Sequence, residues 1–397
     1  LFFYLKRNIE KKNQHILIYI YGAGEAGQKV ANTIINDSSR KLMGFIDDDL
    51  NFKNRKIKNI NILSFDQFSQ IQKLQIQKTI VIIAIPSLNS DRKINLFNKL
   101  KQFNVHIKSI PKIDDIILNN NFSIFNEINY LDLLAKDKLY LDQIKISKDV
   151  HKKNILITGA GGSIGSKLAN NILKYKPNLI ILFELNEYSL FNIESDILSR
   201  INENLYDTKV IPIIGSINDK EKLSKIFENY KIDIIYHAAA LKHVLLVEKN
   251  IIEAIKVNII GTYNLLNIAS NNNVDKFIHI STDKAVNPSN IMGLSKRFAE
   301  VLLMSKKCSM IISIVRFGNV MGSRGSVYEI FDKQIKNSRQ ITVTHPDAKR
   351  YFMSINDASE LVIQAGAMNQ SKNIYSLKMG EQIKITDLAK KMIKIRG

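Results

Sequence analysis

Cysteine is almost absent from the sequence: its 397 residues include one, Cys308. A single thiol excludes an internal disulfide and fits a reducing, cytosolic setting. The seven histidines show no Cys/His or His-Glu-x-x-His spacing, so no metal site is predicted. The chain also lacks an uninterrupted run of about 18 apolar residues, and we therefore expect no segment of it to span a bilayer.

Acidic residues are scarce relative to basic ones. The sequence has 37 Asp and Glu against 57 Lys and Arg, which gives a formal net charge of +20. Such an excess can indicate a nucleic-acid or anionic-membrane partner. Here the lysines are spread along a chain rich in Ile and Asn, and no helical stretch carries a basic stripe interleaved with aromatics. We therefore predict no nucleic-acid partner.

The first residues are apolar and are followed by basic ones. Leu-Phe-Phe-Tyr-Leu at residues 1–5 precedes four Lys and Arg by residue 12, and no initiator Met is present. This pattern is what remains when a transmembrane segment is cut at its cytoplasmic edge. An ordinary frayed helix explains it equally well. In the first interpretation, residues 1–14 are a juxtamembrane segment, and a membrane anchor precedes them in the natural protein.

Residues 15–113 alternate between strand-like and helix-like patterns, which predicts a Rossmann-like domain with a parallel sheet. Gly22, Gly24 and Gly27 form a GxGxxG turn between the first strand and helix, and Asp47 follows the next strand. This arrangement is typical of dinucleotide binding. Nothing after it looks catalytic, so a nucleotide site and a structural turn kept for packing remain equally open.

A linker is predicted over residues 114–150, which lack this alternation. A second α/β domain is predicted over residues 151–397. Its strands are expected at 154–158, 179–183, 209–214, 232–236, 276–280 and 310–315. A helical pattern over 385–395 runs almost to Gly397, so we expect the domain to continue beyond it in the natural protein. The predicted fold class is α/β, with two Rossmann-like, doubly wound parallel sheets.

A second glycine turn opens the first helix of the second domain. Gly159, Gly162 and Gly165 have GxxGxxG spacing, with Ser163 and Ile164 inside the turn. The first glycine permits the tight turn, the second lets a pyrophosphate approach the backbone, and the third lets the helix pack on the strand. The helix dipole favours the phosphate charge. The turn therefore predicts a dinucleotide cofactor.

The choice of cofactor depends on Glu184, which ends the second strand of this domain. A carboxylate there accepts the ribose hydroxyls and repels a 2′-phosphate, which favours NAD over NADP. Glu184 could instead cap the next helix, as Asn186 could. Small residues after the fourth strand would let the cofactor lie across the strand ends. The further cofactor contacts predicted are Ala238, Ala239, Ala240, Asn258 and Lys296.

Polar residues follow the strand predicted at 276–280. Thr282, Asp283 and Lys284 come directly after it, and Met292 and Lys296 lie four residues apart further on. These five residues are the predicted catalytic set. Taken alone, the first three could be a helix cap with a solvated lysine, and Met292 could be a core residue.

From Lys152 to Ile395 the sequence resembles the nucleotide-sugar 4,6-dehydratases of polysaccharide biosynthesis, which belong to the extended short-chain dehydrogenase/reductase (SDR) superfamily. The motifs that carry the resemblance are TGAGGSIG at 158–165, HAAALKHV at 237–244, STDKAVNPSNIMGLSK at 281–296, RFGNVMGSRGSV at 316–327 and ITVTHPDAKRYFMSI at 341–355. The sequence is most similar to the larger, membrane-anchored type that acts on UDP-N-acetylglucosamine. That type has an N-terminal Rossmann-like domain and Met where other relatives keep Tyr. Membership of the superfamily also implies an extended substrate-binding region beyond the second sheet. Leu241 and Leu245 depart from the usual Tyr and Pro of the family.

The resemblance implies an NAD-dependent lyase that converts UDP-N-acetylglucosamine to the 4-keto-6-deoxy sugar for surface glycans. It assigns the acid to Asp283, the base to Lys284 and orientation of the nicotinamide ribose to Lys296. A thioether cannot take a proton from a hydroxyl. With Met292 at this position, either the chain is inactive or Asp283 and Lys284 carry out the acid/base chemistry. Arg324, and after it Arg350, are favoured for the diphosphate. The full set of predicted substrate contacts is Lys242, His243, Asn287, Arg316, Asn319, Arg324 and Arg350.

The same resemblance implies a homo-oligomer at the cytoplasmic face of a bacterial inner membrane, held there by the missing anchor. Two other functions remain open. A nucleotide-sugar epimerase would share the fold and cofactor but normally needs the Tyr that Met292 replaces. A non-catalytic NAD-binding scaffold would not need Asp283 or Lys284.

Overall fold

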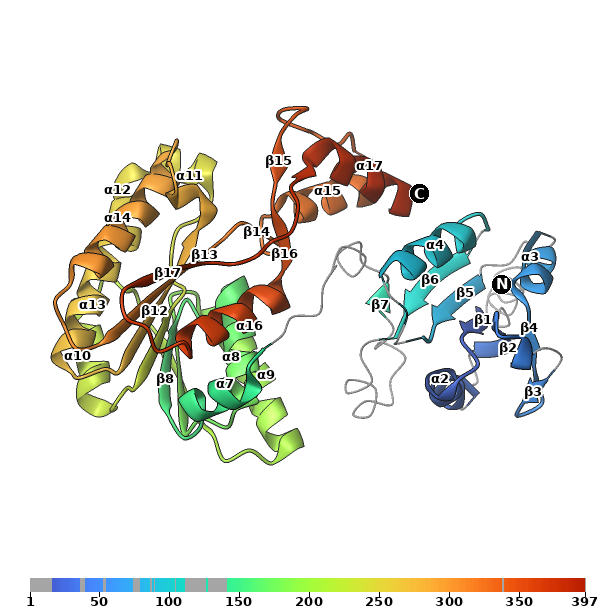
Figure 1. Ribbon diagram of the computed structural model, residues 1–397, viewed down its shortest axis with the longest axis horizontal. Helices are drawn as coiled ribbons and strands as arrows, with labels where there is room; N and C mark the ends of the chain where they lie inside the picture. The colour runs from blue at the N-terminus through green and yellow to red at the C-terminus, as the bar shows by residue number, and fades with distance from the viewer. Residues whose placement is uncertain are drawn as a thin grey trace, which may run out of the picture. The chain divides into compact units, whose positions relative to one another are not determined.

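The computed structural model describes residues 16–35, 40–52, 55–73, 79–85, 88, 90–103, 105–110, 126–127, 141–337 and 339–396. The chain forms two compact units, residues 1–136 and 137–397 (Figure 1). The predicted juxtamembrane segment 1–14 lies outside the described residues, as does most of the predicted linker. In the described ranges no helix is long and apolar enough to cross a membrane.

The N-terminal unit is built on a seven-stranded sheet of order β3-β4-β2-β1-β5-β6-β7. Its parallel strands are β1 (Ile16–Tyr21), β2 (Arg40–Ile46), β4 (Ile60–Leu63), β5 (Thr79–Ile83) and β6 (Val105–Ser109); β3 (Lys56–Ile57) and β7 (Asn126–Glu127) are antiparallel edges. Successive side chains of β1 point to opposite faces. Ile18 and Ile20 pack with helix α2 (Glu25–Ile35), whereas Tyr19 and Tyr21 pack with α3 (Phe65–Lys73) and α4 (Ser90–Leu100).

The C-terminal unit contains a seven-stranded parallel sheet of order β10-β9-β8-β11-β12-β13-β17. The strands are β8 (Asn154–Thr158), β9 (Leu179–Glu184), β10 (Lys209–Ile214), β11 (Ile234–His237), β12 (Lys276–Thr282), β13 (Ile311–Phe317) and β17 (Asn373–Ser376). The strand order reverses direction between β8 and β11. In open α/β sheets such a switch point opens a crevice at the carboxyl ends of the strands, where ligands bind.

Helices cover both faces of this sheet (Figure 1). One face carries α8 (Ser163–Leu173), α9 (Glu187–Asn204) and α16 (Ile355–Gly366). The other carries α10 (Lys220–Asn229), α13 (Thr262–Asn271) and α14 (Ile291–Ser305). Because strands are buried on both faces, they read in sequence as continuous apolar runs such as Ile-Leu-Ile at 155–157. The two doubly wound sheets confirm the predicted fold class.

Further elements complete the C-terminal unit. They are α11 (Val244–Lys249), α12 (Ile251–Ala254), a π-helical segment (Ile255–Gly261), β14 (Asn319–Met321), α15 (Val327–Lys336), β15 (Lys349–Arg350), β16 (Phe352–Ser354), β18 (Ile383–Lys384) and α17 (Ile385–Arg396). β14 pairs with β16, and β15 pairs with β18, outside the main sheet. They form the predicted extended region beyond the Rossmann-like sheet.

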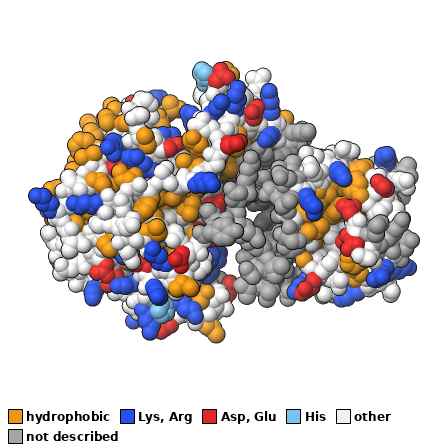
Figure 2. All heavy atoms as spheres, in the orientation of Figure 1, with side chains coloured by type: hydrophobic (Ala, Val, Ile, Leu, Met, Phe, Trp, Pro, Cys, Tyr) orange, Lys and Arg blue, Asp and Glu red, His pale blue; other side chains and the backbone are white. Residues whose placement is uncertain are grey.

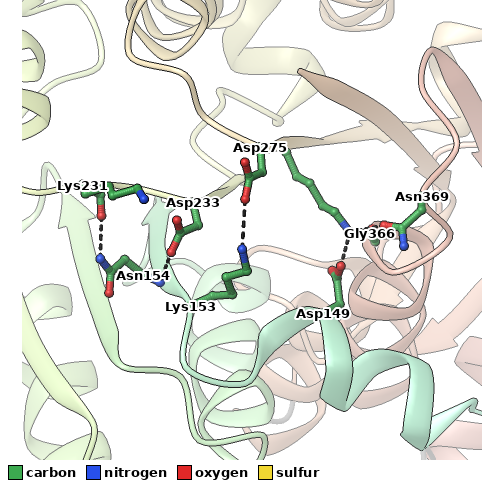
Figure 3. A network of polar contacts seen from close by, with 9 residues as sticks. Asp149, Lys153, Asn154, Lys231, Asp233, Asp275, Gly366 and Asn369 are labelled. Atoms are coloured by element: carbon green, nitrogen blue, oxygen red, sulfur yellow. Dashed lines mark hydrogen bonds and ion pairs between the residues drawn. The ribbon is translucent and has the colours of Figure 1, made fainter. Parts of the chain in front are cut away.

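The opposite, amino-terminal edge of the sheet holds a polar network that anchors helix α7 (Gln143–Val150), the end of the predicted linker (Figure 3). Lys276 is bonded to Asp149 of α7, to Asn369 and to the carbonyl of Gly366. Close by, Lys153 pairs with Asp275 at 3.0 Å. These contacts fix the entry into β8 far from the crevice.

Apolar side chains gather over α11, α12 and α14 on the surface of this unit (Figure 2). The large exposed ones on these helices are Leu245, Leu246, Ile251, Ile252, Leu294, Phe298 and Val301. An exposed apolar face of this kind is typical of a protein–protein contact. The homo-oligomer stays a prediction.

Candidate active site

The glycine turn between β8 and α8 fits a pyrophosphate. Gly159 has a φ of +64°, and a Cβ there would lie 2.8 Å from the backbone of Ala239. At Gly165 a Cβ would lie 2.1 Å from the carbonyl oxygen of Gly159. Helix α8 begins after Gly162 with no side-chain cap, so its first N–H groups are left for a ligand. By contrast, side chains cap α9, α10, α14, α15 and α16.

Glu184 lies at the edge of this turn. Its Oε2 accepts from Gly161 N at 2.9 Å, and its Oε1 accepts from the N–H groups of Leu185 and Asn186. Asn186 caps α9, with Oδ1 accepting from Ser189 N at 2.8 Å. Glu184 is thus not needed as the helix cap, and its remaining lone pairs can accept ribose hydroxyls. Its charge disfavours a 2′-phosphate, so the residues present fit NAD.

The segment after β11 lies against the glycine turn. Ala238 N donates to Thr158 O at 3.1 Å, and Ala239 touches the space that a Cβ on Gly159 would occupy. Asn258, in the π-helical segment, supports the next residues: its side chain bonds both backbone groups of Leu241 and reaches Ser295 Oγ at 2.9 Å. The structure therefore uses the Asn258 amide to hold this segment to α14.

Thr282, Asp283 and Lys284 meet at the carboxyl end of β12. Thr282 Oγ1 donates to Oδ1 of Asp283 at 2.9 Å, and Lys284 Nζ lies 3.0 Å from the same oxygen. Lys284 Nζ also reaches Oδ1 of Asn319, on β14, at 3.0 Å. The side chains of Asp283 and Lys284 are each 27% exposed, so a substrate can reach the pair. The other oxygen, Oδ2, lies next to Gly318, where a Cβ would come within 3.2 Å of it.

Met292 and Lys296 lie on the buried side of α14. Met292 is 4% exposed and packs in an apolar cluster with Val247 and Ala254. Lys296 Nζ lies 3.2 Å from Nε2 of His279 on β12. Burial lowers the pKa of Lys296 to about 8, against an opposing effect of Glu300.

Arg316 does not face the crevice as a free cation. Its Nε and Nη2 bond the two oxygens of Glu300, which is fully buried, at 2.8 and 2.5 Å. Ser281 and Arg297 also donate to this carboxylate. The guanidinium predicted to bind substrate is instead committed to holding β13 against α14.

Arg324 lies at the cofactor turn. Its backbone N donates to Ser163 Oγ at 3.1 Å, and its Nη1 donates to Ser189 Oγ at 3.0 Å. Lys242 Nζ donates to its carbonyl at 3.0 Å, and the ring of His243 fills the space beside Gly325. The structure thus brings Lys242, His243 and Arg324 together, on the side of the pyrophosphate turn.

The remaining predicted substrate residues are spread out. Arg350 is exposed on β15, with Nη1 donating to the carbonyl of Lys349 at 2.8 Å. Asn287 is exposed in the turn before α14 and has a φ of +44°. In the described part of the chain, Asn319 alone of the seven predicted substrate residues forms a hydrogen bond to the Asp283–Lys284 pair.

Sequence reasoning missed Glu300, His279 and His237. His237 Nδ1 lies 2.7 Å from Thr158 Oγ1, and its Nε2 lies 2.9 Å from Thr262 Oγ1. A polar residue in an otherwise apolar run, such as His279 in Phe-Ile-His-Ile, was the available signal. Its partner could not be read from that pattern.

The chain is similar to known proteins in sequence and in structure. The family described as polysaccharide biosynthesis protein matches residues 155–397. The capsular polysaccharide biosynthesis protein CapD of Staphylococcus aureus is 37% identical over an alignment 408 residues long, which covers 100% of this chain and 66% of that protein. The UDP-N-acetylglucosamine 4,6-dehydratase (inverting) of Campylobacter jejuni is 35% identical over 247 residues, 60% of this chain and 70% of that protein.

A UDP-glucose 4-epimerase of Rickettsia akari is 36% identical over 228 residues, 56% of this chain and 65% of that protein. Among solved structures, Pen from Bacillus thuringiensis has a TM-score of 0.58 at 34% identity, over 62% of this chain and 75% of that chain. A dTDP-glucose 4,6-dehydratase of Streptomyces venezuelae, solved with NAD, has a TM-score of 0.54 at 18% identity, over 60% of this chain and 80% of that chain. The latter shows the fold alone.

Proposed function

The chain belongs to the polysaccharide biosynthesis protein family, and we propose that it is an NAD-dependent 4,6-dehydratase of UDP-N-acetylglucosamine. The family membership confirms the resemblance predicted from the motifs. The chain spans about two thirds of the length of CapD, at 66% of that protein. The observation that carries the proposal is the Asp283–Lys284 pair, 3.0 Å apart with both side chains partly exposed, in a site where Met292 replaces the usual Tyr. The Campylobacter relative supports the choice of sugar nucleotide.

Four parts of the site would hold the cofactor. The glycine turn and the first N–H groups of α8 would bind the pyrophosphate, Glu184 would accept the adenosine ribose hydroxyls, and Lys296 would donate to those of the nicotinamide ribose. Ala238–Ala240 leave room for the cofactor along the strand ends. When bound there, NAD would provide the hydride acceptor for oxidation of sugar carbon 4 and the hydride donor for reduction of carbon 6.

Asp283 and Lys284 each take up one proton and release one proton in a turnover, so the proton transfers of the reaction balance. Asp283 takes the proton of the 4-hydroxyl as carbon 4 is oxidised, and later gives that proton to the 6-hydroxyl, which leaves as water. Lys284 takes the proton of carbon 5, which the new ketone acidifies, and returns a proton to carbon 5 from its ammonium group, whose protons exchange with water, after carbon 6 has been reduced. Each residue ends a turnover in the protonation state in which it began, as a general acid or base must.

The hydrogen bond between Lys284 Nζ and Asp283 Oδ1 couples these proton transfers. Elimination needs a protonated Asp283 and an uncharged Lys284. That form arises once Asp283, ionised at the start of the turnover, has taken the 4-hydroxyl proton beside an uncharged Lys284. It and the ion pair then carry the same number of protons and differ only in which side chain holds one. A proton shift along the 3.0 Å bond therefore interconverts them without solvent. Asn319 accepts from Lys284 Nζ in either form and keeps the lysine in place.

An epimerase is the second candidate, because the Rickettsia relative bears that name. Epimerases of the extended SDR superfamily move the 4-hydroxyl proton with a Tyr at the position of Met292. The thioether of Met292 has no proton to exchange, and its side chain is packed against Val247 and Ala254 rather than presented to the crevice. This favours the dehydratase.

The test is to incubate the purified chain with UDP-N-acetylglucosamine that carries deuterium at carbon 4, without added nicotinamide. A dehydratase yields a product that has lost one water and carries the deuterium at carbon 6. In heavy water, unlabelled substrate gains one deuterium at carbon 5. Conversion to the 4-epimer without loss of water would indicate the epimerase. Bound NAD with no change in the sugar would indicate a scaffold.

A further inference from the structure

His279 lies beneath Lys296 in the interior of the C-terminal unit. Nε2 of His279 is 3.2 Å from Lys296 Nζ, and the contact joins strand β12 to the second turn of α14. His279 is 0% and Lys296 6% exposed. Within the described part of the chain, no other hydrogen bond reaches Lys296 Nζ. The histidine is therefore the partner that the structure provides for this ammonium group.

The contact determines the protonation of His279. An ammonium group only donates, so Nε2 must accept and the ring proton must lie on Nδ1. Nδ1 is buried without a partner among the described residues. Burial, with the charge of Lys296, holds the pKa of His279 well below its ordinary value. His279 is therefore a neutral acceptor at any pH near neutrality.

We propose, on the basis of the function proposed above, that His279 is a positioning residue for Lys296: it holds the ammonium group in the cofactor site. One of the three donors of Lys296 is bound to His279, and two are left for the two hydroxyls of the nicotinamide ribose. An apolar residue at position 279 would leave the ammonium buried with no fixed direction.

The charged and titratable groups around Lys296 are engaged elsewhere. His237, the register partner of His279 on β11, is bonded to two threonines, and its ring centroid lies 5.2 Å from that of His279. Glu300, one turn along α14, is bonded to Arg316 of β13. Because a hydrogen bond to the charged form of a group favours that form, His279 keeps Lys296 charged close to neutral pH.

The experiment observes Lys296 directly, in the full chain labelled with [6-¹³C]lysine and without added ligand. The Lys296 resonance is identified by its absence in Lys296→Met. In His279→Leu the titration midpoint of Lys296 is expected to fall by at least about one pH unit, tenfold in the protonation equilibrium. In His279→Gln the amide oxygen accepts in place of Nε2, and the midpoint returns toward that of the unaltered protein.

A matched control separates positioning from packing. Phe277→Leu removes buried volume from the same face of β12 without touching Lys296, and should leave the midpoint unchanged. If His279→Leu does not fold, His279→Met removes the ring nitrogen at similar volume. An unchanged midpoint in the folded Leu or Met variant overturns the inference, because His279 would then be a packing residue.

Calorimetric titration with NAD at pH 8 separates this inference from the proposed function. The unaltered protein should bind NAD, His279→Leu about tenfold more weakly, and His279→Gln close to the unaltered protein. Absence of NAD binding by the unaltered protein would remove the proposed function and, with it, the role of His279 at the ribose. NAD binding that is equally strong in the Leu variant would overturn the inference about His279 alone.

Discussion

Arg316 holds the buried carboxylate of Glu300 through two hydrogen bonds, of 2.8 and 2.5 Å. Burial alone would raise the pKa of Glu300, but hydrogen bonds from Arg316, Ser281 and Arg297 lower it below its usual value. The carboxylate is thus charged inside the unit, and its charge is balanced by a guanidinium from the neighbouring strand.

We expect Arg316→Leu to lower the free energy of unfolding by about 3–5 kcal/mol, because it leaves a buried carboxylate without its main partner. The matched control is Arg297→Leu, which removes a half-exposed partner of the same Glu300 and should cost about 1 kcal/mol or less. Urea denaturation followed by circular dichroism measures both. Equal, small losses in the two variants would show that Glu300 is satisfied without Arg316.

Asp283→Asn and Lys284→Met should each lower the turnover of UDP-N-acetylglucosamine by at least about 10²-fold, the usual scale for a general acid or base. NAD binding should be intact in both, since neither side chain contacts the glycine turn. The Lys284 variant should still oxidise carbon 4 but lose exchange of the carbon 5 proton with heavy water, whereas Asp283→Asn should impair oxidation of carbon 4 as well as loss of the 6-hydroxyl. Turnover near that of the unaltered enzyme in either variant would remove that residue from the mechanism.

Local patterns predicted the parts of the site that lie within one strand-turn-helix unit. The glycine turn is such a part, because Gly159 and Gly165 are required by backbone contacts within or beside the same turn. The pair of Asp283 and Lys284 is another, since adjacent residues after a strand meet in any fold of this class. The strands of the C-terminal sheet that were predicted from apolar runs lie within two residues of those observed for the same reason, whereas the edge strand β17 was not predicted.

Contacts between distant segments could not be predicted in this way. Arg324 reaches Ser163 across 161 positions of the sequence, and only the fold decides that it lies at the cofactor turn rather than elsewhere in the crevice. Arg316 looks like a free cation in sequence because its partner is on another element. A motif thus identifies candidate functional residues. Which partner the side chain of each one contacts depends on the packing of distant elements.

Acid should destabilise the C-terminal unit before its carboxylates titrate. Burial lowers the pKa of His237 to about 3, and that of His279 is also lowered. Between pH 6.5 and about 3 the unfolded chain therefore binds protons that the folded chain does not. The free energy of unfolding should fall as the pH falls through this window, by up to about 1.4 kcal/mol per pH unit for each histidine.

Urea denaturation at several pH values measures this slope. His237→Gln, whose amide can bond Thr158 and Thr262, should make it shallower. His151→Gln replaces an exposed histidine and should leave the slope as it is. A slope equal in His237→Gln and the unaltered protein would show that His237 is protonated in the folded state.

Met292 gives the sharpest test of how the site differs from those of Tyr-containing relatives. Its thioether packs with Val247 and Ala254 and has no proton to exchange, so Met292→Leu, similar in volume, should keep most of the activity and cost less than about 1.5 kcal/mol of stability. Met292→Ala should cost about 2–5 kcal/mol through the cavity it leaves, yet its remaining folded fraction should turn over substrate at a similar rate. Activity per NAD-bound protein, measured beside urea denaturation, separates the two effects. A loss of turnover in Met292→Leu as large as that in Asp283→Asn, in a protein that folds and binds NAD, would mean that the thioether takes part in the chemistry and that the acid and base roles do not lie with Asp283 and Lys284 alone.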